Sequence, residues 1–206
     1  ELMEEHLEKF KPAYPLTAFK AKNKSKHFRT RFVTLFTKLT NALLKNILHL
    51  NEGREGHSSE GDKNMITLQV LVDIFVGLSA MQSVSVRDAA TEATMAIGQA
   101  LVVSAVERRK ELSNLKRLLK SARSDSSGSN GRGASREKLL KRNVSIYEQS
   151  GKAFDKLTDT IFTAVIVHRY KDVQASIRAR CMQYIGDWIS ADPKRYFTED
   201  VVKYIG

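Results

Sequence analysis

Residues 161–188 read IFTAVIVHRYKDVQASIRARCMQYIGDW. The apolar run from Ile161 to Val167 indicates a buried helical segment, and it stops abruptly at His168. Asp172 can cap a following helix, because a carboxylate accepts the free N–H groups of a first helical turn. The apolar residues of that second helix recur at spacings of three and four: Val173, Ile177, Cys181, Tyr184 and Trp188. The stretch predicts a helix–turn–helix unit whose turn, residues 168–171, is unusually polar and aromatic.

The composition around this unit indicates an all-α protein. The chain has 206 residues with only 3 Pro and 11 Gly, and its apolar residues follow long helical periodicities. The single cysteine, Cys181, cannot form an internal disulfide and fits a reducing compartment. No apolar run approaches the roughly 18 residues of a membrane span, and the first residues do not resemble a signal peptide. Since the first residue is not Met, we expect a piece of a longer chain.

Periodicity and breaker residues divide the chain into helices. A low-complexity segment rich in Ser and Gly, residues 121–135, is expected to be flexible. A loop is predicted over residues 51–62. The predicted helices cover residues 1–10, 25–47, 65–78, 84–119, 137–168, 173–190 and 197–205.

An internal repeat predicts how these helices are arranged. Val86-Arg87 and Ile177-Arg178 each open a run of apolar residues at i, i+4, i+7 and i+11, and each follows a short polar turn. The offset of 91 residues is about twice the period of a HEAT-type repeat, ~40–47 residues. We therefore expect an all-α, HEAT-type helical-repeat solenoid with a long, protruding helical hairpin around residues 100–160.

Catalytic chemistry has little support in the sequence. There is no glycine-rich phosphate loop, no His pair at metal-binding spacing and no Cys–His constellation. Cys181 lies on the apolar face of its helix, which is typical of a buried structural thiol. We expect no enzyme, no cofactor and no metal.

The net charge of +11 is concentrated in two blocks, of which the first is the more informative. Residues 9–45 contain ten Lys or Arg and no acid. On a helix, cations spaced by seven form one stripe, and such a row can follow a phosphate backbone without reading bases. The alternative is a solvated helix face with a basic loop. The stripe consists of Lys24, Arg31, Lys38 and Lys45, with Lys20, Lys22, Lys26 and Arg29 at its N-terminal end.

The second block, residues 107–143, contains twelve basic and four acidic residues. Two interpretations stay open for it, a hairpin kept soluble by its charge and a second contact with a polyanion. Arg132 lies between glycines and is a candidate mobile arm for phosphate. The candidate nucleic-acid-binding residues of both blocks are Lys22, Lys24, Lys26, Arg29, Arg31, Lys38 and Arg132.

The 168–172 turn also has two interpretations. In the structural one, Tyr170 packs over the helix junction and Arg169 pairs with a neighbouring acid. In the functional one, the aromatic and guanidinium groups form a docking site for a partner peptide.

Several motifs together resemble one family, the stromalin (stromal antigen) subunits of cohesin. The resemblance covers residues 14–206 and is most specific over residues 165–186, where the chain matches a His-Arg-Tyr turn, an Ile-Arg-Ala-x-Cys element and an Ile-Gly-x-Trp element. The other matching segments are Tyr14–Thr17, Lys26–Arg29, Val76–Ser79, the Val86-Arg87 helix and Lys194–Gly206.

This resemblance implies a nuclear, chromosome-associated, non-enzymatic subunit that joins kleisin in the cohesin ring and helps hold the ring on double-stranded DNA. It implies that the basic N-terminal helix contacts DNA without sequence preference and that the protein supports sister chromatid cohesion and chromosome segregation. It also implies a pocket, shared with kleisin, for short aromatic-motif peptides of cohesin regulators. Three residues carry over to that pocket: Arg169, Tyr170 and Lys171.

The family pattern sets the expected domains and has departures here. Lys171 replaces an arginine and loses its bidentate geometry, and an aromatic of the pocket would fall beyond Gly206. The main kleisin surface would also lie beyond this chain. We expect an N-terminal tail at 1–13, a HEAT-like region at 14–160 and the start of the stromalin conservative domain at 161–206. The alternative function is a generic HEAT-type protein-interaction adaptor that does not bind DNA directly.

Overall fold

The computed structural model describes residues 25–53, 58–125 and 132–204, and within these ranges the chain forms helices and turns without a strand. The all-α prediction is confirmed. The elements are α2 (Ser25–Gly53), α3 (Ser58–Ser79), α4 (Val84–Asp125), α5 (Arg132–Ile161), the π-helix η3 (Phe162–Ile166), α6 (Val167–Arg169), α7 (Ala175–Ala191), α8 (Pro193–Tyr196) and α9 (Glu199–Val202). The predicted helix at 1–10 lies outside the described residues.

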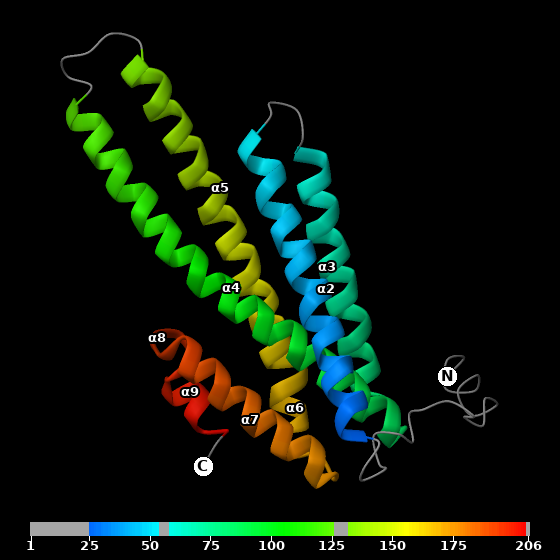
Figure 1. The fold of residues 1–206 in the computed structure, drawn as a ribbon. Helices are drawn as coiled ribbons and strands as arrows, with labels where there is room; N and C mark the ends of the chain where they lie inside the picture. Colours follow the sequence, from blue (N-terminus) through cyan, green and yellow to red (C-terminus); the bar gives the residue numbers. More distant parts are fainter. Residues whose placement is uncertain (1–24, 54–57, 126–131, 205–206) are drawn as a thin grey trace.

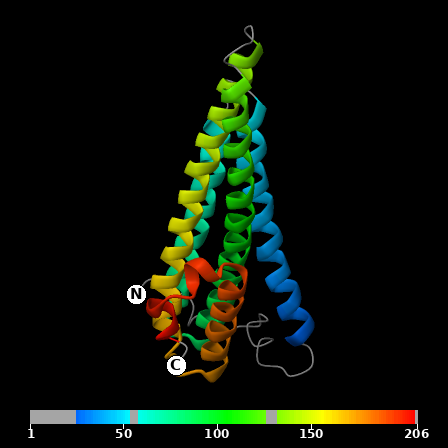
Figure 2. The same cartoon turned by 90° about the vertical axis from the view of Figure 1, so that its left-hand side faces the viewer.

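Two antiparallel hairpins make up most of the molecule (Figure 1). The first is α2–α3, and the second is the longer α4–α5, whose far end extends past α2 and α3 in both views (Figures 1 and 2). The smaller α7, α8 and α9 lie against the opposite end of the long hairpin. The predicted protruding hairpin is therefore present.

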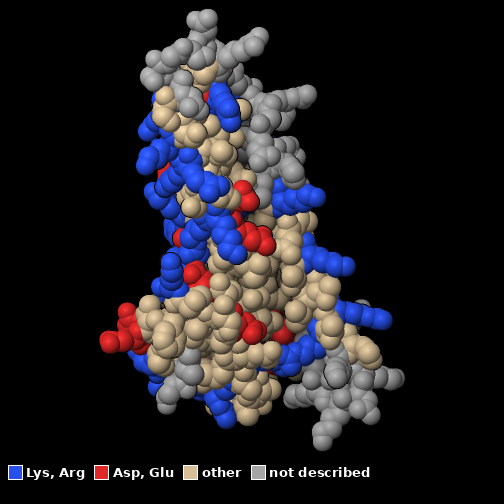
Figure 3. All heavy atoms as spheres, turned by 60° about the vertical axis from the view of Figure 1, so that its left-hand side comes forward, with Lys and Arg blue, Asp and Glu red and all other residues tan. Residues whose placement is uncertain are grey.

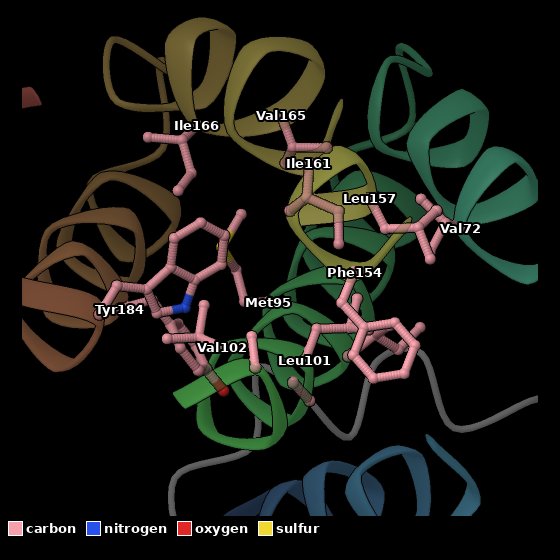
Figure 4. Packing of buried hydrophobic residues seen from close by; sticks show 14 of the residues in the cluster. Val72, Met95, Leu101, Val102, Phe154, Leu157, Ile161, Val165, Ile166 and Tyr184 are labelled. Atoms are coloured by element: carbon pink, nitrogen blue, oxygen red, sulfur yellow. The ribbon is translucent and has the colours of Figure 1, made fainter. Parts of the chain in front are cut away.

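Helix α4 is the centre of the core because α2, α3, α5 and α7 all pack against it. Every residue from Arg87 to Gly98 is buried, and the run is rich in alanine, which lets the neighbouring helices approach closely. Figure 4 shows Met95 and Leu101 of α4 pointing into the same interior as Phe154 and Ile161 of α5. The most apolar window of α4 is 78% buried, as expected of a core helix.

Helices α4 and α7 run parallel, and their contacts explain the internal repeat. Asp88 meets Arg180, and Glu92 meets Tyr184, each 92 residues further along the chain. One long hairpin helix, α5, lies between them in sequence. The offset of 91 residues, about twice a HEAT period, therefore spans one enlarged helical pair.

The repeated arginine has the same structural role in both copies. Arg87 Nη1 donates hydrogen bonds to the carbonyl oxygens of Met81 and Gln82, six and five residues earlier, at 3.0 and 2.9 Å. Arg178 Nη1 donates to the carbonyl oxygens of Asp172 and Val173 at the same two offsets, at 2.7 and 3.2 Å. Each arginine thus closes the turn that precedes its helix.

The predicted breaks between helices were too long. Helix α2 continues to Gly53 and α3 begins at Ser58, within the predicted loop. Both described ends of the segment 121–135 are helical, because α4 continues to Asp125 and α5 begins at Arg132. Contacts across the hairpin favour helix there, including an ion pair between Arg123 and Glu137 at 3.4 Å.

The C-terminal third also differs in detail from the predicted helices. The helix expected over 137–168 contains the π-helical turn η3. The described part of the helix expected at 197–205 is the short α9, which follows the equally short α8. Asp172 was predicted to cap the second helix, but the N-cap residue of α7 is Gln174. Asp172 instead accepts the N–H of Gln174 itself, at 2.9 Å. Pro193 begins α8, as its fixed φ favours.

Candidate functional site

The exposed side of α2 carries a row of cations. Arg31, Lys38 and Lys45 are exposed, and none has an ion-pair partner among the described residues. We call these three residues the α2 stripe. Figure 3 shows separate Lys and Arg side chains projecting along the right-hand edge of the molecule, where α2 lies. Since Arg31, Lys38 and Lys45 are spaced by seven, these three residues lie on one side of the helix.

Arg29 differs from the stripe, because its guanidinium turns toward the core. Its Nη2 lies 2.7 Å from Oε2 of Glu92, whose side chain is only 2% exposed. A sequence signal for this role exists: Arg29 precedes the buried Phe36 by one heptad and so shares the core-facing side of α2. The structure thus separates Arg29 from Arg31 and Lys38.

The structure describes the remaining candidate nucleic-acid-binding residues only in part. Lys22 and Lys24 lie outside the described residues, and the side chain of Lys26 is also outside them. Arg132 is the first residue of α5 and not part of a loop, and its side chain is not described. Of the seven predicted residues, the described structure therefore places Arg31 and Lys38 on one exposed surface.

The α4–α5 hairpin carries a denser but partly neutralised set of cations (Figure 3). Lys116 pairs with Glu148 and Lys141 with Glu137, both at 2.7 Å. The hydrogen bond from Lys141 holds the pKa of Glu137 below its ordinary value. Several exposed hairpin cations have no ion pair with a described residue, among them Lys110, Arg117, Lys120, Arg136 and Lys138.

Glu92 is a buried hub that ties α2 and α7 to α4. Besides Arg29, it receives Arg180 Nε at 2.8 Å on the same oxygen and the Tyr184 hydroxyl at 3.3 Å on the other. Burial, followed by the Glu92 charge, raises the pKa of Tyr184, so this hydroxyl remains a donor. Arg180 also holds Asp88. The hub fixes the helix that carries the α2 stripe.

The polar turn of the opening sequence stretch is organised around Asp172, which is 5% exposed. Arg87 binds its two oxygens with Nε and Nη2 at 2.8 and 3.2 Å, and Arg169 Nη1 lies 3.0 Å from Oδ2. Burial opposes the ionised form, but the hydrogen bonds from Arg87, Gln174 and Arg169 together hold the pKa of Asp172 below its ordinary value. Arg169 therefore pairs with an acid, as the structural interpretation predicts.

Aromatic side chains meet at the same turn. The Tyr170 ring packs edge-on against Tyr204 with 4.9 Å between centroids, and Tyr204 packs against Phe162 at 5.7 Å. Lys171 Nζ lies 5.0 Å from the Tyr170 centroid, and hydrogen bonding to Tyr170 raises the pKa of Lys171. Both tyrosines are half-buried. The sequence signal for Tyr204 was weak, because this residue lies 34 positions beyond the turn.

Reactive groups at this end of the molecule are structural. Cys181 is fully buried, and burial raises the pKa of its thiol to about 12, which keeps it protonated. Within the described ranges, no three His, Cys, Asp or Glu side chains gather as a metal site requires.

Comparison with known proteins identifies the family. A family model described as the STAG domain matches residues 12–141, and one described as the Stromalin conservative domain matches residues 171–206. This chain belongs to the STAG-domain family of cohesin SA and Scc3 subunits. The resemblance drawn from the sequence motifs is confirmed.

Individual relatives support the same family assignment. Cohesin subunit SA-3 of Homo sapiens is 31% identical over 137 residues, and cohesin subunit scc-3 of Caenorhabditis elegans is 25% identical over 169 residues. These alignments cover 66% and 82% of this chain but only 11% and 15% of the relatives. The solved structure of cohesin subunit Scc3 from Z. rouxii matches 98% of this chain and 22% of its own length, with a TM-score of 0.76 and 20% identity. That match confirms the helical-repeat solenoid.

Proposed function

We propose that this STAG-domain chain is a non-enzymatic scaffold of a nuclear, chromosome-associated cohesin subunit. We also propose that it contacts double-stranded DNA, without reading its sequence, through the α2 stripe. The observation that supports the DNA contact is the absence of counter-charge: Arg31, Lys38 and Lys45 are exposed, and no carboxylate of the described residues pairs with them. On the α4–α5 hairpin, by contrast, acids pair with several of the cations.

The spacing of the stripe suits a phosphate backbone. Seven residues of α-helix rise about 10 Å, so the three cations extend over roughly 20 Å. A row of this length can lie along several phosphates of a duplex and release their condensed counterions. Because contacts of this kind do not reach base edges, binding should not depend on sequence.

We expect the triple variant Arg31→Glu, Lys38→Glu, Lys45→Glu to lose most duplex binding. In wild type, we expect log affinity to fall linearly with log salt concentration. A neutral triple variant, with Gln at the same positions, should flatten that slope by about 2 to 3, since each phosphate contact contributes about 0.9. Mobility shifts with two duplexes of unrelated sequence, across a salt series, measure both effects.

A control with the same change in charge separates the stripe from net charge. Lys63, Lys156 and Lys194 are exposed, lie on other helices and have no ion pair among the described residues. Their triple Glu variant should bind nearly as wild type does. Equal loss in both variants would mean that only total charge matters. Unchanged binding of the stripe variant would favour the alternative of an adaptor without direct DNA contact.

We further propose that Tyr170, with Lys171 and Arg169 at its sides, docks short aromatic-motif peptides of cohesin regulators in a longer chain bound to kleisin. The half-buried Tyr170–Tyr204 pair supports this, because it offers ring surface next to cations. We place the start of the stromalin conservative domain at residue 161 in the same proposal, with the HEAT-like region at 14–160 before it.

We expect Tyr170→Ala to weaken binding of a Phe-x-Phe peptide at least about tenfold in a complex of the longer chain with kleisin, since aromatic anchors are typical hot spots. Isothermal titration measures the affinity. Phe197→Ala is the matched control, because Phe197 is an exposed aromatic outside the cluster. Peptide binding that survives Tyr170→Ala would reject this site.

A further inference from the structure

Arg108 of α4 is a buried arginine that has no carboxylate partner in the part of the chain that the structure describes. Its exposed fraction is 4%, and no described residue forms an ion pair with it. The other buried arginines are neutralised, Arg87 by Asp172 and Arg180 by Asp88 and Glu92. Arginine is rarely buried unless it is paired, because an uncompensated charge in the interior is costly. The cation at Arg108 therefore needs an explanation.

The contacts of Arg108 satisfy only part of its guanidinium. Nη1 donates to the Ser150 hydroxyl at 2.7 Å, and the group lies 4.3 Å from the centroid of the Phe154 ring. Burial lowers the pKa of Arg108 to about 10, so the group stays charged at neutral pH. Nε and Nη2 have no acceptor among the described residues.

Those two nitrogens are the pair that holds a carboxylate side-on. Elsewhere in this molecule, Arg87 uses Nε and Nη2 to bind the two oxygens of Asp172 at 2.8 and 3.2 Å. Such bidentate pairs are strong and geometrically selective for planar carboxylates. Arg108 thus presents the same fork without an acceptor from the described chain.

Arg108 also lines a cleft of about 480 Å³ between α2, α4 and α5. This volume is within the range of sites that bind small ligands or peptide side chains. The wall combines apolar Leu44 and Val103 with the acids Glu107 and Glu111, and the remaining lining residues are Asn41, Lys45, Ser104 and Tyr147. The two acids disfavour a duplex backbone here, but they are complementary to basic residues on a peptide.

We propose that this cleft binds a peptide segment of a partner protein through one Asp or Glu side chain, which Arg108 holds with Nε and Nη2. Basic residues next to that acid face Glu107 and Glu111. Both nitrogens are shielded from solvent in this structure, so the side chains that line the cleft rearrange when the carboxylate enters. The cleft shares Lys45 with the α2 stripe, but peptide binding by Arg108 does not require that the stripe binds DNA.

The test uses the full chain of 206 residues, labelled with ¹⁵N, and two probe peptides. These are acetyl-Lys-Leu-Glu-Leu-Lys-amide and its analogue with Gln in place of Glu. We expect the Glu peptide to bind about tenfold or more tightly than the Gln peptide, because it alone provides a charge-assisted bidentate acceptor. It should also shift the Nε–H resonance of Arg108.

Two variants and one control decide the assignment. Arg108→Gln should make the two peptides equivalent. Asn41→Trp fills the cleft from the exposed side of α2, leaves the Arg108 side chain in place and should weaken the Glu peptide about tenfold or more. Lys110→Gln, a change at a neighbouring exposed cation, should have no effect. Lys45, which the cleft shares with the α2 stripe, is unchanged in all three variants, so any difference between them comes from the other residues of the cleft.

Several results would overturn the proposal. They are equal affinity for the two peptides in wild type, no binding of either peptide at millimolar concentration, and a Glu preference that survives both Arg108→Gln and Asn41→Trp. Displacement of the peptide by a 20-base-pair duplex, together with weaker duplex binding by Arg108→Gln, would assign the cleft to nucleic acid instead.

Discussion

Glu92→Gln is expected to lower the free energy of unfolding by about 3–5 kcal/mol, the usual cost of removing one member of a buried charge network. The Glu92 side chain is 2% exposed and receives both Arg29 and Arg180 on one oxygen, at 2.7 and 2.8 Å. Glutamine keeps the shape but leaves two guanidinium groups without this negative charge. For a chain of this size the melting temperature should fall by about 6–20 °C.

The matched control is Glu148→Gln. Glu148 pairs with Lys116 at 2.7 Å at the surface of the α4–α5 hairpin, where water screens the charges, so its loss should hardly change the unfolding curve. Chemical denaturation of the three proteins with urea measures the difference. A Glu92→Gln protein as stable as the control would show that the network contributes no net stability.

The same variant tests how the fold supports the proposed DNA surface. Arg29 is the ion-pair link from α2 to the Glu92 hub. We expect amide hydrogen exchange in α2 to accelerate more than in α5 when Glu92 is replaced, because no described residue of α5 forms an ion pair or hydrogen bond with Glu92. Equal acceleration in both helices would mean that the hub stabilises the domain as a whole and does not hold α2 in particular.

Sequence periodicity was sufficient for the helical class and for most of the helices, because apolar residues at spacings of three and four are a local property of the chain. It underestimated helix length where contacts across a hairpin stabilise polar sequence. Asp125 and Arg132 show this: both belong to helices although they lie in a segment of low complexity. The Arg123–Glu137 pair that helps to hold these ends links residues 14 apart, beyond any local pattern.

The functional residues also divide into those that a local pattern predicts and those that depend on contacts between residues far apart in the sequence. The heptad spacing of Arg31, Lys38 and Lys45 predicts a common side of α2, and the structure places all three there, exposed. Sequence reasoning grouped Arg29 with them because it counted charge and could not see Glu92, 63 residues further on. Arg108 was counted in the second basic block for the same reason, since its burial results from packing between α4 and α5.

Gly98→Ala is expected to destabilise the fold by about 1–3 kcal/mol, although alanine is the better helix former by up to about 1 kcal/mol. A Cβ atom on Gly98 would lie 2.5 Å from Cζ2 and 3.2 Å from Cη2 of the Trp188 indole. The indole cannot move easily, because Trp188 is 1% exposed and packs against Tyr196 with 5.3 Å between ring centroids. Helices α4 and α7 must therefore separate or the indole must leave its rotamer.

Gly186→Ala and Gly151→Ala are the controls, since a Cβ at either position meets no atom within 4 Å. Both should leave stability unchanged or raise it by up to about 1 kcal/mol, the helix-propensity gain. Opposite signs for Gly98 and the two controls distinguish a steric effect from a general response of helical glycines. Thermal and urea unfolding curves measure all three.

The decisive measurement is the double variant Gly98→Ala, Trp188→Phe. Phenylalanine lacks the ring atoms that the new methyl would meet, and the methyl fills part of the space that Trp188→Phe opens. We expect Gly98→Ala to be neutral or stabilising in the Trp188→Phe background, so the coupling between the two sites should be at least about 1 kcal/mol. Additive effects would show that the cost of Gly98→Ala arises from the α4 backbone and not from the close approach of α7. That approach brings Trp188, the last residue of the stretch that predicts the fold, against α4.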